Sequence, residues 1–325
     1  MHAVDKIHRQ SDPAFTDLLN KYRVGTALTS AEKDLLWDHD THVDRDAIRI
    51  FPRRNTMDTM NTTELQRLPG SEIALRCVDS CRWNEDKDDY ERYDLAKRWE
   101  RAWPGDEYSL FVAFTMDRHR YDETFHFKLG MPVVLLANLN RTHKLVNGSQ
   151  GRIIGFEDYH PDKLPRAKQD SKEDHTLKQW IFFGEQAQYQ EAEVRKFCSR
   201  ASPSMRRWPI VEFKHGVTDV ICTIYPYCEV HEIGSDEPFS LMSRKQIPLL
   251  AAWAITTHKS QGMTLDQAEI DMSSAWEHGQ TYTAMSRVKT LEGLKVTGLA
   301  YGKACRADAT VRQFMDETTW VKGAG

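Results

Sequence analysis

The chain has 325 residues, 40% of them hydrophobic and 28% charged, which is the composition of a soluble globular protein with one large domain or two modest ones. Its formal net charge of -4 excludes a wholly basic nucleic-acid-binding protein, so any nucleic-acid surface must be local. No stretch approaches the roughly 20 apolar residues that cross a bilayer, and the start is too polar for a secretory signal, so we expect no membrane partner. The six cysteines lack CxxC spacing, which favours reduced thiols in an intracellular protein and no metal site.

The N-terminal segment predicts two helices, a strand and a further helix. Residues 12–38 carry apolar side chains at helical spacing, and Ser30 is expected to cap the second helix within this range. Residues 47–51 alternate as a short strand. Residues 56–68 return to helical spacing, so this part of the chain has the strand-to-helix pattern of an α/β protein.

The middle of the chain is densely charged at residues 80–108 and then becomes rich in β-forming residues. A hydrophilic insertion loop is expected at residues 157–178, and another loop at residues 138–147. The strands that we expect lie at residues 127–136, 148–156, 180–183, 210–213 and 217–224. Five short strands within about 115 residues predict a small barrel.

A basic stretch at residues 195–211 has two interpretations. It contains Arg195, Lys196, Arg200, Arg206 and Arg207 without an acidic residue, and Trp208 lies among them. Such a stretch is suited to a local nucleic-acid surface on which an exposed Trp stacks against bases. A solvated basic loop with Trp208 in the barrel core explains the same residues.

The most informative segment is residues 251–271. Its apolar run ends in Thr256 and Thr257, and a polar loop at residues 258–262, His-Lys-Ser-Gln-Gly, follows. Hydroxyls, a lysine and a glycine at the carboxyl end of a buried strand suit contact with phosphates, because Gly lets the backbone approach closely and Lys supplies charge. An ordinary polar surface turn has the same residue types.

Residues 280–288 predict a helix with Gln280, Thr283 and Arg287 on one face. The planar donor fork of an arginine on such a face matches the oxygens of a phosphate. An arginine that interacts only with the helix dipole is the alternative.

Four strings in the sequence are similar to motifs of one helicase group. Thr-His-Lys-Ser-Gln-Gly-Met-Thr-Leu-Asp, at residues 257–266, resembles motif V of superfamily-one DNA helicases, in the RecD-like branch that includes the Pif family. Residues 279–287, followed by Leu-Glu-Gly-Leu, resemble motif VI. Residues 7–13 resemble the segment usually written Val-Phe-Arg-Gln, with His8 in place of the usual aromatic residue. Leu-Pro-Gly at residues 68–70 matches the end of a helix in the same family.

This resemblance implies an α/β fold, specifically a second RecA-like helicase lobe of the P-loop NTPase type with an inserted small β-barrel of Src-homology-three type. The implied domains are residues 1–125 for the first part of the lobe, 126–241 for the barrel, and 242–325 for the remainder. The family's activity is ATP-driven, 5′-to-3′ unwinding of DNA in replication, recombination, repair or telomere maintenance. Nucleus or mitochondrion is the compartment that the family implies.

The resemblance also implies roles for individual residues. Arg287, and less closely Arg9, match arginines that contact the γ-phosphate of ATP and are the implied catalytic residues. The implied cofactor-binding residues are Gly262, Gln280 and Arg287. The implied contacts to single-stranded DNA are Thr257, His258, Lys259, Ser260 and Gln261.

A P-loop is missing from the sequence. A phosphate-binding loop needs Gly-x-x-x-x-Gly-Lys-Ser/Thr, whereas Gly302-Lys303 is followed by Ala304. The apolar strand ending in an acid that forms a Walker B element has its only lookalike at residues 111–117, in the wrong order. ATP and Mg²⁺ belong to the complete family enzyme, and we expect neither to bind stably to this chain alone. The chain is then the C-terminal portion of a helicase whose N-terminal lobe is a missing partner; a non-catalytic nucleic-acid-binding module or a relic of a transposon helicase is the alternative.

Overall fold

The computed structural model describes residues 2–3, 9–10, 12–37, 41, 43–44, 47–83, 119–167, 181–182, 184–200, 207–214, 219–233, 240–275, 277, 279–298, 313 and 321–322. The chain forms two compact units. Unit 1 consists of Met1–Arg67 and Ala251–Gly325, and unit 2 is Leu68–Leu250. The three-part division expected from the sequence, with boundaries after residues 125 and 241, remains a prediction about domains. The contacts between described residues divide the chain at other positions.

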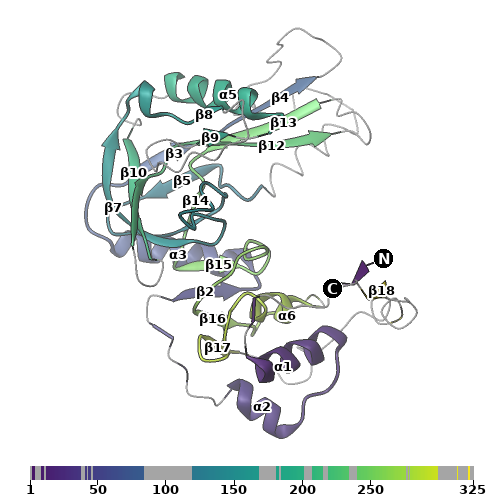
Figure 1. Cartoon of the computed structure of the whole chain (residues 1–325). Helices are drawn as coiled ribbons and strands as arrows, with labels where there is room; N and C mark the ends of the chain where they lie inside the picture. The colour runs from purple at the N-terminus through teal and green to yellow at the C-terminus, as the bar shows by residue number, and fades with distance from the viewer. Residues whose placement is uncertain are drawn as a thin grey trace, which may run out of the picture. The chain divides into compact units, whose positions relative to one another are not determined.

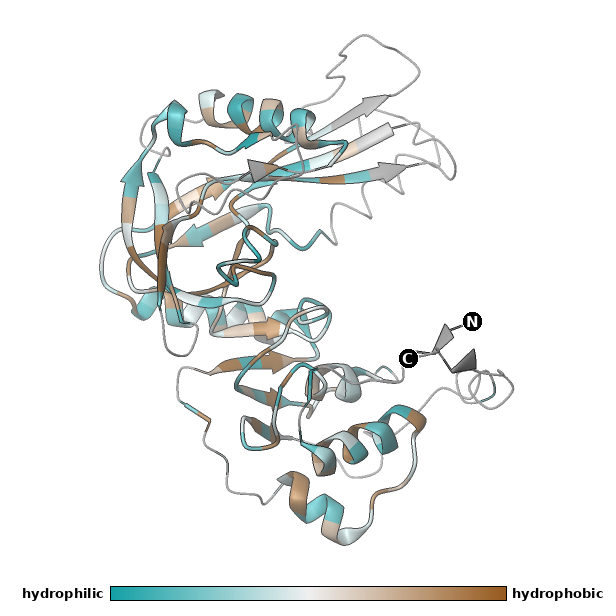
Figure 2. Cartoon of the chain, viewed as in Figure 1, coloured by the Kyte–Doolittle hydropathy of each residue, from teal (hydrophilic) through white to brown (hydrophobic). Residues whose placement is uncertain are grey.

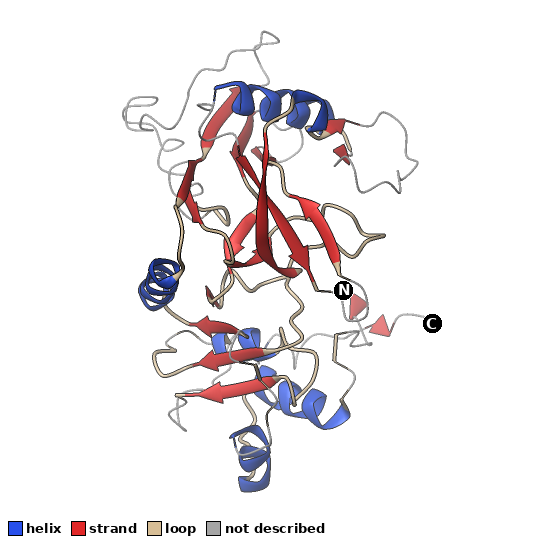
Figure 3. Ribbon diagram, turned by 90° about the vertical axis from the view of Figure 1, so that its left-hand side faces the viewer, coloured by secondary structure: helices blue, strands red, loops and turns tan. Residues whose placement is uncertain are grey.

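A parallel sheet forms the centre of unit 1 (Figures 1 and 3). Its strands are β2 (Ile48–Phe51), β15 (Ala254–Thr256), β16 (Ala268–Asp271) and β17 (Leu294–Thr297), in the order β15-β2-β16-β17. All three neighbouring pairs are parallel. Ile50, Ile255 and Ile270 are fully buried, and apolar side chains concentrate on β2 and β15 (Figure 2). Burial of this kind is typical of a sheet covered on both faces, so the α/β expectation is confirmed.

Among the described residues of unit 1, helices α1 (Pro13–Val24), α2 (Ser30–Trp37), α3 (Arg54–Arg67) and α6 (Gln280–Met285) are formed. They confirm the helices expected within residues 12–38 and 56–68. Gly25, with φ of 70°, ends α1 by donating its N–H to carbonyls of the last turn. The expectation that Ser30 caps α2 is wrong, because Ser30 is already helical. Thr29 is the cap: its hydroxyl accepts the Glu32 N–H, and the Glu32 carboxylate accepts the Thr29 N–H.

Helix α3 packs on β2 and β15 and also protects an edge of the sheet. Met57 is buried against Phe51 and Ala254. The side-chain amide of Asn61 accepts the Ala254 N–H at 2.9 Å and donates to the Ala254 carbonyl at 2.8 Å. Because β15 is the outer strand, its backbone groups would otherwise be free to pair with another chain. A short pairing of β1 (His2–Ala3) with β18 (Val321–Lys322) completes the described strands of this unit.

Unit 2 is built mainly from antiparallel strands. A five-stranded sheet has the order β11-β10-β7-β6-β14, and a three-stranded sheet has the order β12-β13-β4. Two strand pairs, β3 with β5 and β8 with β9, a helix, α5, and a short 3-10 helix accompany them. The bounds are β3 Ile73–Arg76, β4 Val78–Trp83, β5 Thr124–Phe127, β6 Pro132–Leu135, β7 Gln150–Asp158, Pro161–Lys163 for the 3-10 helix, β8 Arg166–Ala167, β9 Ile181–Phe182, α5 Ala187–Arg200, β10 Arg207–Phe213, β11 Val220–Thr223, β12 Tyr227–Ile233, β13 Ser240–Gln246 and β14 Leu249–Ala251.

The strands expected in this unit are largely confirmed, with one split in two. The single strand expected at residues 127–136 is wrong, because a turn at Gly130, with φ of 82°, separates β5 from β6. The insertion loop expected at residues 157–178 contains the 3-10 helix and β8 in its described part. The Walker-B-like string at residues 111–117, and residues 84–108 of the charged segment, lie outside the described residues.

Helix α5 corrects the interpretation of the basic stretch as a loop. Arg195, Lys196 and Arg200 belong to this helix, whose inner face buries Val194, Phe197 and Cys198. Trp208 is fully buried on β10, so the core interpretation is correct and the ring is not free to stack on bases. None of the helices within the described ranges is long and apolar enough to cross a membrane.

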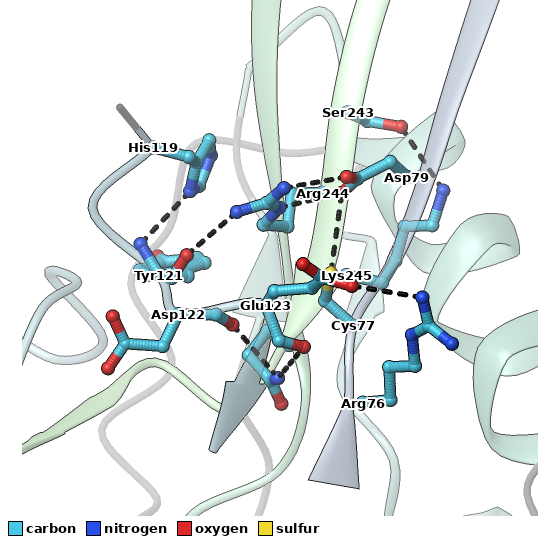
Figure 4. A network of polar contacts seen from close by, with 11 residues as sticks. Arg76, Cys77, Asp79, His119, Tyr121, Asp122, Glu123, Ser243, Arg244 and Lys245 are labelled. Carbon is cyan, nitrogen blue, oxygen red and sulfur yellow. Dashed lines mark hydrogen bonds and ion pairs between the residues drawn. The ribbon is translucent and has the colours of Figure 1, made fainter. Parts of the chain in front are cut away.

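One buried ion pair joins two strands of the three-stranded sheet (Figure 4), and a second joins this sheet to helix α5. Arg244 on β13 donates from Nε and Nη2 to the carboxylate of Asp79 on β4, at 2.7 Å each, and from Nη1 to the Tyr121 carbonyl at 2.9 Å. The next residue, Lys245, pairs with Glu193 of α5 at 2.6 Å. Burial by itself would lower the pKa of Arg244, but the hydrogen bonds to Asp79, the charge of Asp79 and the nearby Cys77 and Glu123 together outweigh it and raise that pKa. Neighbouring residues on a strand point to opposite faces, so each face of β13 is fixed by one pair.

Candidate functional site

The candidate site lies at the carboxyl ends of β2 and β15 in unit 1. The N–H of Thr257, just after β15, donates to the carbonyl of Phe51, the last residue of β2, at 3.0 Å. Both chain segments therefore leave the sheet side by side. A hollow of about 410 Å³ opens between them, lined by Pro52, Arg53, Arg54 and His258. In open parallel sheets this edge is where ligands bind.

The residues of the 258–262 loop divide into buried and exposed side chains. Ser260 is fully buried, and its hydroxyl donates to the Thr257 carbonyl at 2.7 Å. Thr257 is also buried, with its hydroxyl 3.5 Å from the Phe51 carbonyl. His258 and Gln261 are exposed and Lys259 is half-buried. The two hydroxyls thus stabilise the turn, while the exposed side chains remain available to a ligand.

An acidic residue connects this loop to helix α6. The Nε2 of His258 lies 3.3 Å from a carboxylate oxygen of Glu277. The side-chain amide of Gln280, the first residue of α6, lies 3.4 Å from the same carboxylate and accepts the Glu277 N–H at 3.4 Å. Gln280 is buried, so its amide holds Glu277 in place.

A second part of the site brings two arginines together from opposite ends of the chain. Arg9 donates from Nη1 to the Ser286 carbonyl at 3.0 Å and from Nε to the Thr264 hydroxyl at 3.1 Å. Arg287 donates from Nε to the Thr283 carbonyl at 2.9 Å and from Nη2 to the Ser286 hydroxyl at 2.8 Å. Gln10 holds the N-terminal segment here by donating to the carbonyls of Ser286 and Val288, at 2.9 and 3.0 Å.

The electrostatics of this arginine pair favour an anion. Burial lowers the pKa of Arg287, and the positive charge of Arg9 lowers it further. No acidic side chain within the described ranges forms an ion pair with either guanidinium. Two partly desolvated cations without a counterion are stabilised by any anion that reaches both. A phosphate, with several acceptor oxygens, matches the donor forks.

Several of the residues predicted from the sequence are brought together here. Arg9 and Arg287 both contact Ser286, and Gly262, with φ of 79°, belongs to the loop that leads to Thr264. The helix expected at residues 280–288 is shorter, because α6 ends at Met285 and Arg287 lies in the following turn. The ligand roles of these residues, and those of Thr257, His258, Lys259, Ser260 and Gln261, remain predictions.

The sequence reasoning missed the other wall of the hollow. From the sequence, no role is assigned to Arg53, Arg54, Glu277 or Gln10. The available signal was the position of Arg53, two residues beyond the strand predicted at residues 47–51. Parallel strands end at one edge, so Arg53 and His258 were expected neighbours once β2 and β15 were paired.

Comparison with known proteins gives the family. Residues 122–156 match the model described as DNA helicase Pif1, 2B domain. The chain is 39% identical over 183 residues to ATP-dependent DNA helicase Pif1 of a Psychrobacter species, covering 55% of this chain and 27% of that protein. It is 28% identical over 308 residues to ATP-dependent DNA helicase PIF1 of Emericella nidulans, covering 89% of this chain and 36% of the relative. The chain is thus similar to Pif1 helicases over most of its length.

The fold is similar to a crystal structure of the Pif1 helicase from Candida albicans, with a TM-score of 0.59 at 21% identity, covering 96% of this chain and 59% of that one. The Pif1 2B-domain match falls on β5, β6 and most of β7, all in unit 2. The resemblance to Pif helicases inferred from residues 257–266 and 279–287 is thereby confirmed. The chain spans about a third of the length of the Emericella nidulans Pif1 protein, 36% of it.

Proposed function

We propose that this chain supplies the second RecA-like lobe of an ATP-dependent DNA helicase, together with an inserted Src-homology-three-like barrel. The parallel α/β sheet of unit 1 is consistent with the lobe. The antiparallel pairing of β6, β7, β10 and β11 in unit 2 is consistent with the barrel. ATP with Mg²⁺ and single-stranded DNA are the proposed ligands of the complete enzyme, which translocates 5′ to 3′ in the nucleus or mitochondrion and serves repair, recombination or telomere maintenance.

The observation that carries this proposal is the meeting of Arg9 and Arg287 at Ser286, although 277 residues separate Arg9 from Ser286. Two arginines that form no ion pair with any acidic residue in the described part of the chain suit the γ-phosphate of ATP held by another lobe. Arginines in this position neutralise the charge that develops during phosphoryl transfer and accelerate it by roughly 10³ to 10⁵-fold. They do so only where a P-loop and a metal ion hold the nucleotide, and the P-loop string is absent from this sequence.

Single-strand binding is the first test. Fluorescence anisotropy of a labelled oligothymidylate with the purified chain, at low and at physiological salt, should detect binding that weakens steeply as salt rises, because counterions are released from the strand. Absence of binding at low salt would contradict the proposed DNA contact.

Measurement of ATP hydrolysis tests whether this chain needs a P-loop lobe for activity. The purified chain should hydrolyse ATP no faster than a protein-free blank, with or without DNA. Joining it to the P-loop portion of the Psychrobacter relative should produce DNA-stimulated hydrolysis. In the joined protein Arg287→Ala should lower the rate by about 10³-fold or more. Arg23→Ala, at an exposed position on α1, is the matched control; equal rates for the two variants would refute the role of Arg287.

A further inference from the structure

Strand β15 is short and lies at the edge of the sheet in unit 1. It consists of Ala254–Thr256, and among the described strands it pairs only with β2. A pairing of so few residues specifies its register weakly. Because the 258–262 loop follows this strand directly, a shift of β15 by one residue would move the loop by about 3.3 Å.

The side chain of Asn61 supplies the neighbour that β15 lacks on its outer side. Its amide accepts the Ala254 N–H at 2.9 Å and donates to the Ala254 carbonyl at 2.8 Å. A side-chain amide offers the same donor and acceptor as a peptide group. Trp253, the residue before Ala254, directs its carbonyl to β2 instead, where it accepts the Arg49 N–H at 3.0 Å. A shift of β15 by one residue would therefore present Asn61 with backbone groups that face β2, and both hydrogen bonds would be lost.

Helix α3 holds Asn61 at this edge. Met57, one helical turn before Asn61, is buried against Phe51 and Ala254, and Met60 packs on the same cluster. Residues four apart lie on one face of a helix, so the packing of Met57 directs Asn61 toward β15. The amide is thus a fixed partner of the strand and not a mobile surface group.

The register of β15 determines where the 258–262 loop lies. The Ser260 N–H donates to the Thr256 carbonyl at 3.0 Å, and the Lys259 N–H donates to the Thr256 hydroxyl at 3.2 Å. Thr256 is the last residue of β15, in the same three-residue strand as Ala254. A contact at Ala254 therefore places loop side chains that Asn61 itself does not touch.

We propose that Asn61 is a positioning residue: its amide fixes the register of β15 and thereby places the exposed side chains of the 258–262 loop for contact with single-stranded DNA. This rests on the proposed function, because that function makes single-stranded DNA the ligand of the loop. Asn61 needs no contact with the DNA, since it acts through the backbone of Ala254. Protection of the sheet edge alone would leave the loop unaffected, whereas a fixed register makes DNA binding depend on the amide.

Hydrogen exchange of the full chain tests the effect of Asn61 on the register directly. Asn61→Ala should speed amide exchange of residues 254–262 about tenfold, because two hydrogen bonds that hold Ala254 are lost. Thr29→Ala is the control for a general loss of stability, since it removes the cap of α2 in the same unit. This control should leave the exchange of residues 254–262 nearly unchanged.

Binding of a labelled oligothymidylate at low salt tests the consequence for the loop. Asn61→Ala should weaken binding about fivefold, because the binding-competent register is then populated for only part of the time. Asn20→Ala removes the same amide group from an exposed position on α1 and should leave the affinity unchanged.

A pH-dependent rescue separates positioning from a general loss of packing. In Asn61→Asp the ionised carboxylate has only acceptors, so it repels the Ala254 carbonyl, whereas the protonated carboxyl has a donor and an acceptor as the amide does. The affinity of Asn61→Asp relative to the unmodified chain should therefore rise as pH falls from about 7.5 to about 5. The relative affinity of Asn61→Ala should stay constant over the same range.

The outcomes separate this inference from the proposed function. If the unmodified chain binds no oligonucleotide at low salt, the DNA contact and its positioning by Asn61 are both overturned. If it binds, and Asn61→Ala matches its controls in exchange and in affinity, the proposed function stands and Asn61 has no positioning role. Faster exchange without weaker binding would overturn the positioning role and leave Asn61 as protection of the sheet edge. A relative affinity of Asn61→Asp that does not change with pH would also overturn the role of the amide.

Discussion

Charged side chains have opposite roles in the two units. In unit 2, Arg244 and Lys245 are buried and each is held by a carboxylate at close range. In unit 1, Arg53 is exposed, and Arg9 and Arg287 form hydrogen bonds to carbonyls and hydroxyls and no ion pair with any described acidic residue. The residue types are the same in both units. A basic residue whose charge is already neutralised stabilises the fold, whereas one without a counterion can bind an anion.

The largest expected effect concerns the buried pair of unit 2. Arg244→Met leaves the Asp79 carboxylate buried without its partner, and we expect the free energy of unfolding to fall by about 3–5 kcal/mol. Chemical denaturation followed by circular dichroism measures it. Arg76→Ala breaks an exposed pair with Glu123 and should cost about 1 kcal/mol or less. An equal loss in the free energy of unfolding for the two variants would contradict the difference between buried and exposed ion pairs.

A tightly packed glycine tests how closely the interior of unit 1 is packed. A Cβ added to Gly293 would lie 2.2 Å from the Asp266 carbonyl oxygen, so backbone must move. Gly293→Ala should therefore lower the stability of unit 1 by about 1–3 kcal/mol. Gly155→Ala in unit 2, where a Cβ meets only ordinary contacts at 3.5 Å, is the control. If Gly293→Ala left the stability of unit 1 unchanged, the backbone around this glycine would have moved to admit the methyl group at no cost.

Removal of the Ser260 hydroxyl distinguishes a structural role from a ligand-binding role for this loop residue. Ser260→Ala removes the buried hydrogen bond to the Thr257 carbonyl and should cost about 1 kcal/mol of unit 1 stability. Oligonucleotide affinity should change little, because the hydroxyl is fully buried. A large loss of affinity with unchanged thermal stability would instead assign Ser260 a direct contact.

The smallest effect is the acid dependence of an exposed charge in unit 1. The hydrogen bond from Lys21, followed by that from the Thr29 N–H, lowers the pKa of Glu32 from 4.5 to about 2. Because the folded pKa is depressed, the stabilisation is present above pH 4.5 and is lost as pH falls toward 2. Glu32→Gln should make the midpoint of thermal unfolding less dependent on pH over this window, and Asp34→Asn on the same helix is the control. An unaltered pH profile would show that the capping pair contributes nothing.

Much of unit 1 could be predicted from the sequence, since its elements are local patterns. The strand at residues 47–51, the helix beginning near residue 56 and the loop at 258–262 each depend on apolar spacing followed by turn residues. Position within the loop could not be predicted in the same way. Thr257 and Ser260 look as polar as His258 in the sequence. Their hydroxyls can nevertheless be buried, because nearby backbone carbonyls accept hydrogen bonds from them.

Unit 2 was harder to predict because its pairings are long-range. Strand β4 pairs with β13 across more than 150 residues, and no local pattern encodes the match of Asp79 with Arg244. Helix α5 was missed because its many polar residues hide three buried positions, Val194, Phe197 and Cys198, which become visible only at helical spacing. Gly130 divided a continuous apolar run because a positive φ ends a strand whatever the hydropathy of its neighbours.

The strand order β15-β2-β16 has a consequence for biosynthesis. Strand β2 is made early, yet both of its neighbours in the sheet are encoded about 200 residues later. During translation β2 must wait, with both edges unpaired, while the continuous Leu68–Leu250 segment emerges and folds. A ribosome that stalls before Ala254 leaves an apolar strand with no partner, which favours aggregation or capture by a chaperone. The residues from Ala254 to Asp271 thus decide whether β2 becomes part of an ordered sheet.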